Sequence, residues 1–165
     1  MAVRPIVRFP DPRLRRKAEP VGEVTDEIRD LARDLADTMA AAPGVGITAP
    51  HVGVLLRVMV IRLEGDPGPL TYIDPEIVWF SPERSRQSEG SVSMPGVIDE
   101  IERPARVRMR YRDLDGTSRE EEAEGFRAIC YQHEIDQLDG IFWIDRLSRL
   151  KRDRLIRRFE KLHRP

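Results

Sequence analysis

The stretch Gln132-His-Glu-Ile-Asp-Gln-Leu-Asp-Gly140 decides the fold. It completes a segment from Gly125 to Leu138 whose apolar residues fall on two sides, a pattern that is typical of a buried central helix. On such a helix His133 and Gln137 lie one turn apart and can meet a common ligand, with Glu134 beside them as a possible base. A His-Glu-x-x-His metal helix would need histidine at 137, where this chain has glutamine. The stretch therefore predicts a central helix with reactive polar side chains and an incomplete metal motif.

Patterns on both sides of this helix predict the other elements. Helical spacing follows a Thr25 cap and ends at Pro43-Gly44, and a last amphipathic helix follows Ser148. Runs rich in β-branched and aromatic residues, or with strict alternation, predict strands at Arg57 to Leu63, Leu70 to Phe80, Ala105 to Arg112 and Thr117 to Glu124. The last two strands should pair through an Asp115-Gly116 hairpin, with arginines facing acidic residues. Because the helices are separated from a run of antiparallel strands, an α+β fold is expected.

Length and composition limit the classes of protein to which this chain can belong. The 165 residues have the size of one domain, with an extended arm at 1–24 and a C-terminal helix at 147–165. Apolar residues make up 40% and charged residues 35%, which favours a globular chain and excludes a disordered, disulfide-built or membrane class. The 28 basic and 29 acidic residues nearly cancel, so net charge predicts no nucleic-acid partner. A single cysteine, Cys130, and an N-terminus without the apolar core of a signal peptide indicate the cytoplasm.

Two further stretches join the first in carrying reactive residues: Gly44-Val-Gly-Ile-Thr-Ala-Pro-His51 and Glu89-Gly-Ser-Val-Ser-Met-Pro-Gly96. With them, the chain resembles the peptide deformylase family over nearly its whole length. The family's Glu-Gly-Cys-Leu-Ser motif has Ser91 in place of its cysteine, its Gln-His-Glu-x-Asp-His motif has Gln137 in place of its second histidine, and its Gly-x-Gly-x-Ala-Ala-x-Gln motif ends in His51. The resemblance implies the peptide deformylase fold, in which antiparallel sheets surround a central helix that carries the degenerate His-Glu-x-x-Gln motif.

The resemblance also implies what has changed in the chemistry. In the family, the cysteine and two histidines hold a divalent metal, usually iron, that binds a water; the glutamate moves protons, and the glutamine helps to hold the developing oxyanion. A serine hydroxyl and a glutamine amide are poor replacements toward iron, zinc or nickel, which prefer sulfur and nitrogen donors. His133 is the one family ligand retained, so no metal or other cofactor is expected. A divalent metal site rebuilt around His51 is the alternative.

Three functions fit the altered cleft. The first is a metal-independent enzyme acting on a small acyl, amide or peptide-like substrate, with His133 as general acid or base, Glu134 orienting it or acting alone, and Ser91 or His51 completing the site. Two histidines converging there would titrate near neutral pH. Adjacent helical residues point about 100° apart, so Glu134 is badly placed to hold the ring of His133. The second function is a non-catalytic binding protein, and the third is a true deformylase with an unusual metal shell.

A peptide or small molecule is the expected ligand of the cleft. The residues expected to contact it are Gly44, Val45, Gly46, Ile47, Glu89, Gly90, Val92, Ile129 and Gln137. Residues 145–165 carry nine Lys or Arg against three Asp or Glu. Such a helix is a possible ribosome contact, as the resemblance to bacterial deformylases implies, although a solvated helix face explains the same pattern.

Overall fold

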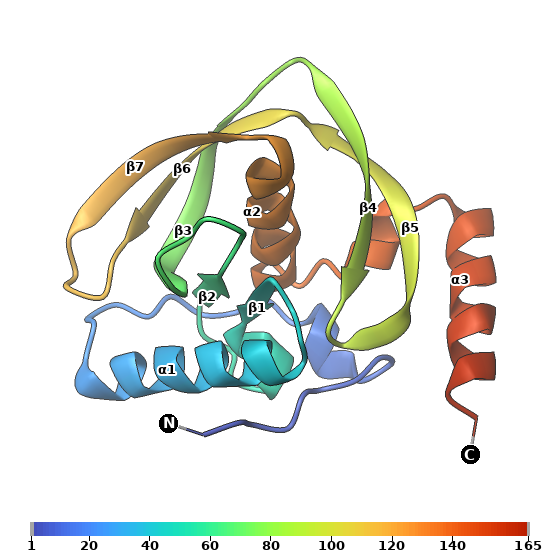
Figure 1. Ribbon diagram of the computed structural model, residues 1–165, viewed down its shortest axis with the longest axis horizontal. Helices are drawn as coiled ribbons and strands as arrows, with labels where there is room; N and C mark the ends of the chain where they lie inside the picture. Colours follow the sequence, from blue (N-terminus) through green and yellow to red (C-terminus); the bar gives the residue numbers. More distant parts are fainter. Residues whose placement is uncertain (1, 165) are drawn as a thin grey trace.

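The computed structural model describes residues 2–164, so the two end positions of the predicted arm and C-terminal segment, 1 and 165, lie outside it. The described chain folds into α-helices, antiparallel strands and short 3₁₀ turns (Figure 1). The helices are α1 (Asp26–Ala41), α2 (Gly125–Leu138) and α3 (Arg149–Leu162). The strands are β1 (Gly46–Thr48), β2 (Val58–Ile61), β3 (Leu70–Phe80), β4 (Arg84–Ser91), β5 (Met94–Pro104), β6 (Arg106–Arg112) and β7 (Ser118–Glu124), and the 3₁₀ turns are η1 (Pro12–Arg15), η2 (Ala49–Val52) and η3 (Trp143–Arg146).

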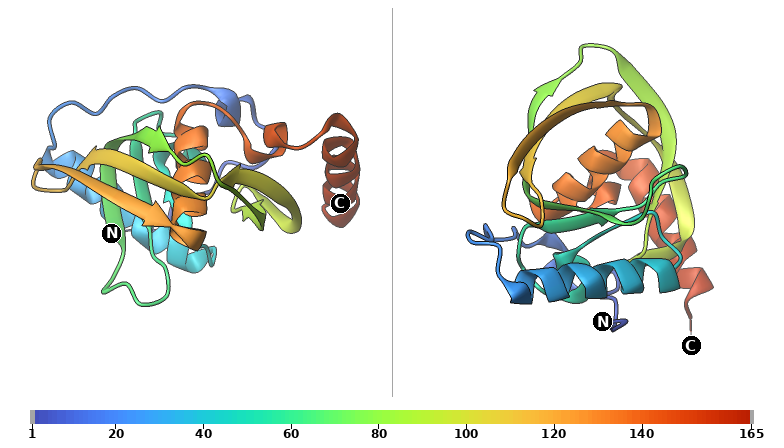
Figure 2. Two further views of the ribbon diagram at one scale, coloured as in Figure 1. Left: turned by 90° about the horizontal axis from the view of Figure 1, so that it is seen from above. Right: turned by 60° about the vertical axis from the view of Figure 1, so that its left-hand side comes forward.

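The helix α2 stands at the centre of the molecule. A five-stranded antiparallel sheet, in the order β1-β2-β3-β6-β7, lies on one side of it, and the two-stranded β4–β5 hairpin lies on the other (Figure 1). Seen from above, α3 lies outermost, beyond the hairpin (Figure 2). Side chains on opposite faces of α2 can therefore reach the sheet and the hairpin, which confirms the prediction of an α+β fold with a buried central helix.

Local sequence signals account for several of these elements. The Thr25 hydroxyl accepts a hydrogen bond from the backbone N–H of Ile28 at 3.4 Å and caps α1 as predicted. The bounds of β3 and α2 also agree with the prediction. The pairing of β6 with β7 sets three arginines opposite three glutamates: Arg106↔Glu124, Arg108↔Glu122 and Arg110↔Glu120. The exposed charged ladder predicted from the alternation is confirmed.

The β4–β5 hairpin is the largest element that the sequence prediction missed. The reactive stretch that starts at Glu89 contains the end of β4, a turn through Val92 and Ser93, and the start of β5. The prediction failed because β4 reads RSRQSEGS, without the β-branched or aromatic residues that mark most strands. Hydrogen bonding to β5 holds β4 in an extended conformation that its own residues do not predict.

The N-terminal arm ties the three reactive stretches together. The backbone N–H of Val7 donates to the carbonyl of His51 at 2.7 Å, that of Phe9 to Ser93 at 2.9 Å, and that of Ala18 to Leu138 at 2.8 Å. The arm is extended, as predicted, apart from η1, which the prediction did not include. Each motif is thereby connected to one continuous segment.

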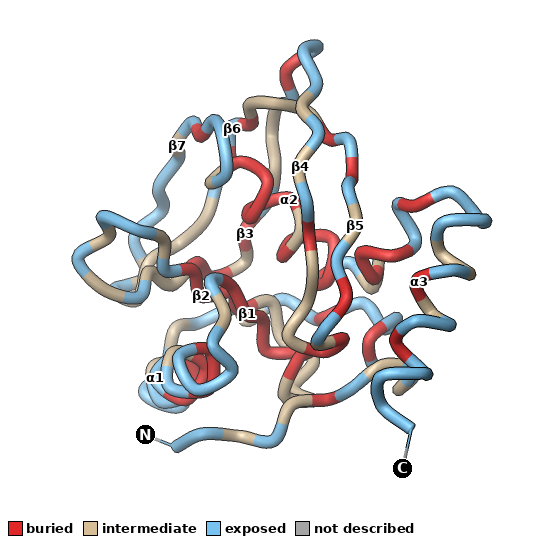
Figure 3. The backbone as a smooth tube through the Cα atoms, turned by 45° about the vertical axis from the view of Figure 1, so that its right-hand side comes forward, coloured by how far each residue is buried: buried red, intermediate tan, exposed pale blue. Residues whose placement is uncertain are grey.

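The hydrophobic core surrounds α2. Tyr131 and Leu138 pack with Met59 and Met109 of the sheet, while α1 covers β1 and β2. The residues of β1 and β2 are buried, whereas most residues of α3 are exposed (Figure 3). No helix within residues 2–164 is long and apolar enough to span a membrane.

Candidate active site

The three reactive stretches meet at one cavity of about 900 Å³. Residues 44–46 and His51 form one wall, the β4–β5 hairpin a second, and α2 a third. The cavity brings together the four side chains that the sequence nominated for chemistry: His51, Ser91, His133 and Glu134. Its volume lies within the range of small-molecule sites, roughly 300–1,000 Å³.

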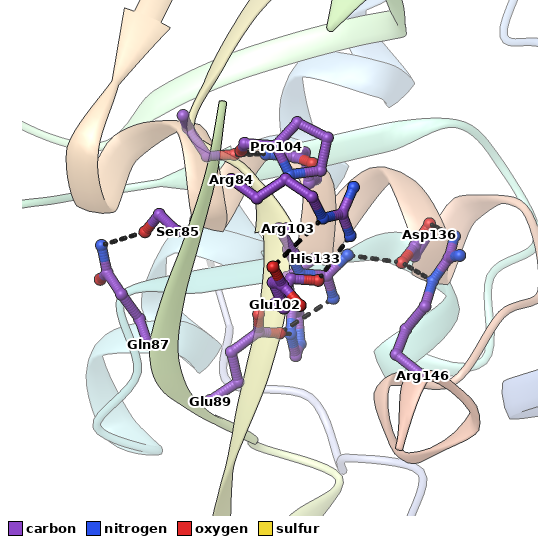
Figure 4. Close-up of polar contacts among 12 residues, drawn as sticks. Arg84, Ser85, Gln87, Glu89, Glu102, Arg103, Pro104, His133, Asp136 and Arg146 are labelled. Carbon is purple, nitrogen blue, oxygen red and sulfur yellow. Dashed lines mark hydrogen bonds and ion pairs between the residues drawn. The ribbon is translucent and has the colours of Figure 1, made fainter. Parts of the chain in front are cut away.

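His133 is held by a carboxylate from the facing hairpin. Its Nδ1 lies 2.8 Å from Oε1 of Glu89. The same carboxylate accepts hydrogen bonds from Arg103, at Oε2 from Nε (2.6 Å) and at Oε1 from Nη2 (2.9 Å) (Figure 4). Burial alone would raise the pKa of Glu89, but the hydrogen bonds from His133 and Arg103 outweigh it and the pKa is lowered. Because Glu89 is therefore ionised, Nδ1 donates the proton and Nε2 is left as the acceptor of the neutral ring.

A chain of buried charges fixes this carboxylate. Nη1 of Arg103 donates to Asp136 at 2.8 Å, and Asp136 accepts from Nε and Nη2 of Arg146 at 2.9 and 2.8 Å (Figure 4). Arg103 is 4% exposed and Glu89 6%. The two carboxylates and two guanidiniums balance in charge and join β4, β5, α2 and η3. Glu89 is thus held in one position relative to the ring of His133.

The charge environment shifts the pKa of His133 upward. Burial alone would lower this pKa, but the carboxylates of Glu134 and Glu89 together outweigh burial and raise it. The imidazolium form persists to higher pH than in a free histidine. His133 can accept a proton from the cavity and hold it.

Glu134 offers a buried carboxyl group to the cavity. The residue is 5% exposed, and its Oε1 has no hydrogen-bond partner among residues 2–164. The carboxylate rests against Gly46, where an added Cβ would collide with it, so a side chain at 46 would displace it. Burial, with repulsion from Glu89, raises the pKa of Glu134, although His133 opposes the shift. The glutamate therefore holds a proton more readily than an exposed one.

His51 is locked as a neutral ring. Thr48 is the N-cap of η2, and its backbone N–H donates to Nδ1 of His51 at 2.9 Å, so that the imidazole closes a capping box. Burial, with repulsion from His133, lowers the pKa of His51 to about 3. Since Nδ1 accepts, the proton of the neutral ring is on Nε2, which has no partner among residues 2–164. The expectation that His51 and His133 titrate together near neutral pH is wrong, because full burial keeps His51 uncharged.

The other nominated residues divide into two groups. Most line the cavity: Gly44, Val45, Gly46, Glu89, Gly90, Ser91, Val92 and Ile129. Ile47 and Gln137 do not. Ile47 points to the opposite face of β1 from Gly46 and packs in the core with α1. The amide of Gln137 donates to the Leu14 carbonyl at 2.7 Å, so the arm holds it away from the cavity.

The sequence analysis considered Glu134 as the orienting carboxylate, although badly placed for it, and did not consider Glu89. Glu89, and not Glu134, holds the ring of His133. The Ser91 hydroxyl accepts from the backbone N–H of Ser93 at 3.0 Å, and no hydrogen bond joins Ser91 to His133. Glu89 and His133 belong to different motifs and are more than forty positions apart in the sequence. Their contact is therefore visible only in the folded structure.

Several residues that line the cavity were not predicted from the sequence. Val3, Arg4, Ile6 and Arg8 come from the arm, and Ile98 and Phe126 extend the rim. Val45, Ile98 and Phe126 are 46%, 61% and 47% exposed, an unusual cluster of large apolar side chains beside polar groups. The alternation of residues 4, 6 and 8 within an extended arm is the pattern from which the arm's role could have been found.

Comparisons with known proteins agree with this geometry. The sequence model of the polypeptide deformylase family matches residues 3–153. The chain belongs to this family. A relative from Brucella melitensis named peptide deformylase-like is 62% identical, covering 99% of this chain and all of its own. A peptide deformylase from Afipia carboxidovorans is 48% identical over 98% of this chain and 96% of its own. The peptide deformylase from Ehrlichia chaffeensis in complex with actinonin superposes with a TM-score of 0.92 at 40% identity, covering 100% of both chains.

The residues present do not fit the metal that the deformylase family normally uses. Within residues 2–164, no group of three or more His, Cys, Asp or Glu is arranged to hold a metal ion. Gln137 donates to Leu14, and an amide that donates in this way turns its nitrogen, not a lone pair, toward its partner. Burial, with repulsion from Glu134 and Glu89, raises the pKa of the nearby Cys130 to about 12, so its thiol stays protonated and is a poor ligand. The donor set of this deformylase relative therefore differs from that of the family motif.

The buried ion network predicts a large effect of Arg103→Met on stability. Removing Arg103 leaves the buried Glu89 without its cationic partner and takes one of the two guanidiniums from Asp136, so the free energy of unfolding should fall by about 3–5 kcal/mol in urea denaturation. Arg86→Met is the matched control, since Arg86 lies on the adjacent strand in an exposed pair with Glu102 at 3.9 Å. It should change stability by at most about 1 kcal/mol. Equal effects of the two variants would contradict a structural role of the network.

The neutral state of His51 predicts a pH dependence of stability. Its pKa of about 3 in the folded chain lies below the unfolded value of about 6.5. Its stabilising contribution is therefore complete above pH 6.5 and is lost as the pH falls toward 3, by up to about 1.4 kcal/mol per pH unit. His51→Gln removes this titration, so the slope of unfolding free energy against pH should be shallower between those limits. Identical slopes in urea denaturation of both proteins would show that His51 is not buried as a neutral ring.

Proposed function

We propose that this deformylase relative is an acid/base enzyme that acts, without a bound metal, on the acyl or amide group of a small peptide-like substrate. The observation that carries the proposal is the hydrogen bond from His133 to the buried Glu89, which leaves Nε2 as the proton acceptor of the ring. The same cavity holds two polar atoms that have no hydrogen-bond partner within residues 2–164, Oε1 of Glu134 and Nε2 of His51. Such convergence of oriented and perturbed groups is characteristic of catalytic sites.

Each of the three side chains has a distinct role in cleaving an amide. His133, held by Glu89, takes a proton from an attacking water at Nε2. The N–H of His51 donates to the carbonyl oxygen as negative charge develops there; because the ring is neutral, it does so at any pH near 7. Glu134, whose raised pKa makes it hold a proton more readily than an exposed carboxyl, is the group that gives a proton to the leaving nitrogen.

The shape of the cavity supports a peptide-like substrate. The exposed rim formed by Val45, Ile98 and Phe126 suits an apolar side chain, and the polar groups lie deeper. Ser91 lines the wall, and since its oxygen accepts from Ser93 its hydroxyl proton is available to a ligand. The Ehrlichia chaffeensis relative was solved with actinonin, which supports a small-molecule ligand for the fold.

Binding without catalysis is the second candidate. It is favoured by the apolar rim and by the unpaired atoms of His51 and Glu134, which can bind a ligand whether or not a reaction follows. Deformylation with an unusual metal shell rests on family membership alone, because the donor set does not fit. A cytoplasmic location and a ribosome contact through the basic α3 stay predictions.

Whether turnover survives treatment with metal chelators distinguishes the metal-independent enzyme, the binding protein and the metal-dependent deformylase. Formyl-Met-Ala and acetyl-Met-Ala are incubated with the full chain before and after treatment with EDTA and 1,10-phenanthroline, and the released Met-Ala is measured by mass spectrometry. We expect turnover that chelators leave unchanged. Activity that disappears on chelation and returns with iron would identify a metalloenzyme, and saturable binding without Met-Ala release would identify a binding protein.

The acid/base roles predict the effects of two substitutions. His133→Asn and Glu134→Gln should each lower kcat by at least about 100-fold, since each removes a proton-transfer group but keeps its approximate size. Glu120→Gln, on the exposed face of β7, is the control and should keep full activity. Thermal denaturation is measured in parallel. A lowered Tm with unchanged kcat in the first two variants would assign His133 and Glu134 to structure instead.

A further inference from the structure

The N-terminal arm forms a wall of the cavity, and its backbone is fixed on both sides of Arg8. Val7 donates its N–H to the His51 carbonyl at 2.7 Å, and Phe9 donates to the Ser93 carbonyl at 2.9 Å. Neighbouring side chains of an extended segment point in opposite directions. Val7 and Phe9 pack into the hydrophobic cluster under α3, so Arg8 points the other way and lines the cavity together with Ile6 and Arg4.

The guanidinium of Arg8 has no partner in the part of the chain that the structure describes. Arg4 is paired, since its Nε and Nη2 lie 2.9 and 2.8 Å from Oδ2 of Asp34. The Arg8 side chain is exposed and makes no hydrogen bond or ion pair with residues 2–164; only the Arg8 backbone carbonyl is bonded, accepting from the N–H of Asp11 at 2.9 Å. Its other neighbours are Glu160, His163 and Arg164, which line a shallow depression beside it at the end of α3. Arg8 therefore presents a full set of unused donors at the cavity.

Charge is distributed unequally around the cavity. Toward α2 lie the carboxyls of Glu134 and Glu89, of which Glu89 is compensated by Arg103. On the arm side lies the uncompensated cation of Arg8. A ligand that places its amide among His51, His133 and Glu134 and extends toward the arm would bring its far end to a guanidinium. A guanidinium binds a carboxylate through two parallel hydrogen bonds and so recognises it specifically.

We propose that Arg8 binds a free carboxylate of the ligand, so that the substrate is a short N-acylated peptide with an unblocked C-terminus and not the beginning of a long chain. This inference rests on the proposed function, because it takes the amide to lie at the acid/base groups. It adds the chemical class of the far end of the substrate. The length is limited because both ends lie within one cavity of about 900 Å³.

Calorimetric titration tests the assignment with a pair of ligands that differ in one charge. Acetyl-Met-Ala and its C-terminal amide are titrated into the wild-type full chain and into Arg8→Gln. We expect the wild type to bind the free acid about five- to tenfold more tightly than the amide, and this preference to shrink as salt is added. Arg8→Gln should weaken binding of the free acid by the same factor and leave binding of the amide unchanged.

Arg16→Gln is the matched control. Arg16 is an exposed arginine of the same arm that does not line the cavity, so its loss changes net charge equally and should leave both affinities as in the wild type. Equal wild-type affinity for acid and amide would overturn the role of Arg8 and leave the proposed function standing. Equal weakening of both ligands in Arg8→Gln would mean that Arg8 only shapes the arm. Failure of the wild type to bind either ligand would overturn the proposed function, and this inference with it.

Discussion

The ion pair between Arg103 and Glu89 lies inside the protein, where water cannot stabilise either charge, and its two hydrogen bonds of 2.6 and 2.9 Å join the two strands of the hairpin. Isolating charges in this way is unfavourable unless every remaining donor and acceptor finds a partner. Asp136 and His133 supply those partners from α2. The position of the hairpin, the shape of the cavity and the tautomer of His133 therefore depend on one buried pair.

Burial acts on three ionisable groups at this site, yet it gives them different states. His51 has no carboxylate partner, so burial keeps it neutral and makes its Nε2 a permanent donor. The pKa of His133 rises because neighbouring carboxylates outweigh burial, and that of Glu134 rises because burial disfavours its charge. One low-dielectric cavity thus supplies a proton acceptor, a neutral donor and a proton source. The two histidines differ because neighbouring carboxylates outweigh burial at His133 and not at His51.

The sequence predicted the elements whose side chains signal their own environment, such as α2 with its two apolar faces and β6 with its exposed arginines. It missed the β4–β5 hairpin, because β4 is polar and is held extended by its hydrogen bonds to β5 and not by a pattern in its own residues. The reactive residues were found from residue type and from the resemblance to the family motifs, but their protonation states were not. The pKa of His51 depends on burial and on the Thr48 N–H, and the orientation of His133 depends on a residue from another element. The pKa of one histidine and the orientation of the other therefore depend on contacts between segments that are far apart in the sequence.

The motif positions of this site differ in how their polar atoms are satisfied. Ser91 accepts from Ser93, and Gln137 donates to Leu14, so both replacements have partners within the chain. His51 and Glu134 each bury a polar atom that no residue between 2 and 164 contacts. Such an atom destabilises the folded state by about 1–3 kcal/mol. A site kept for stability alone would pair these atoms as it pairs the other two, so the arrangement favours a ligand that approaches from the cavity and supplies the missing partners.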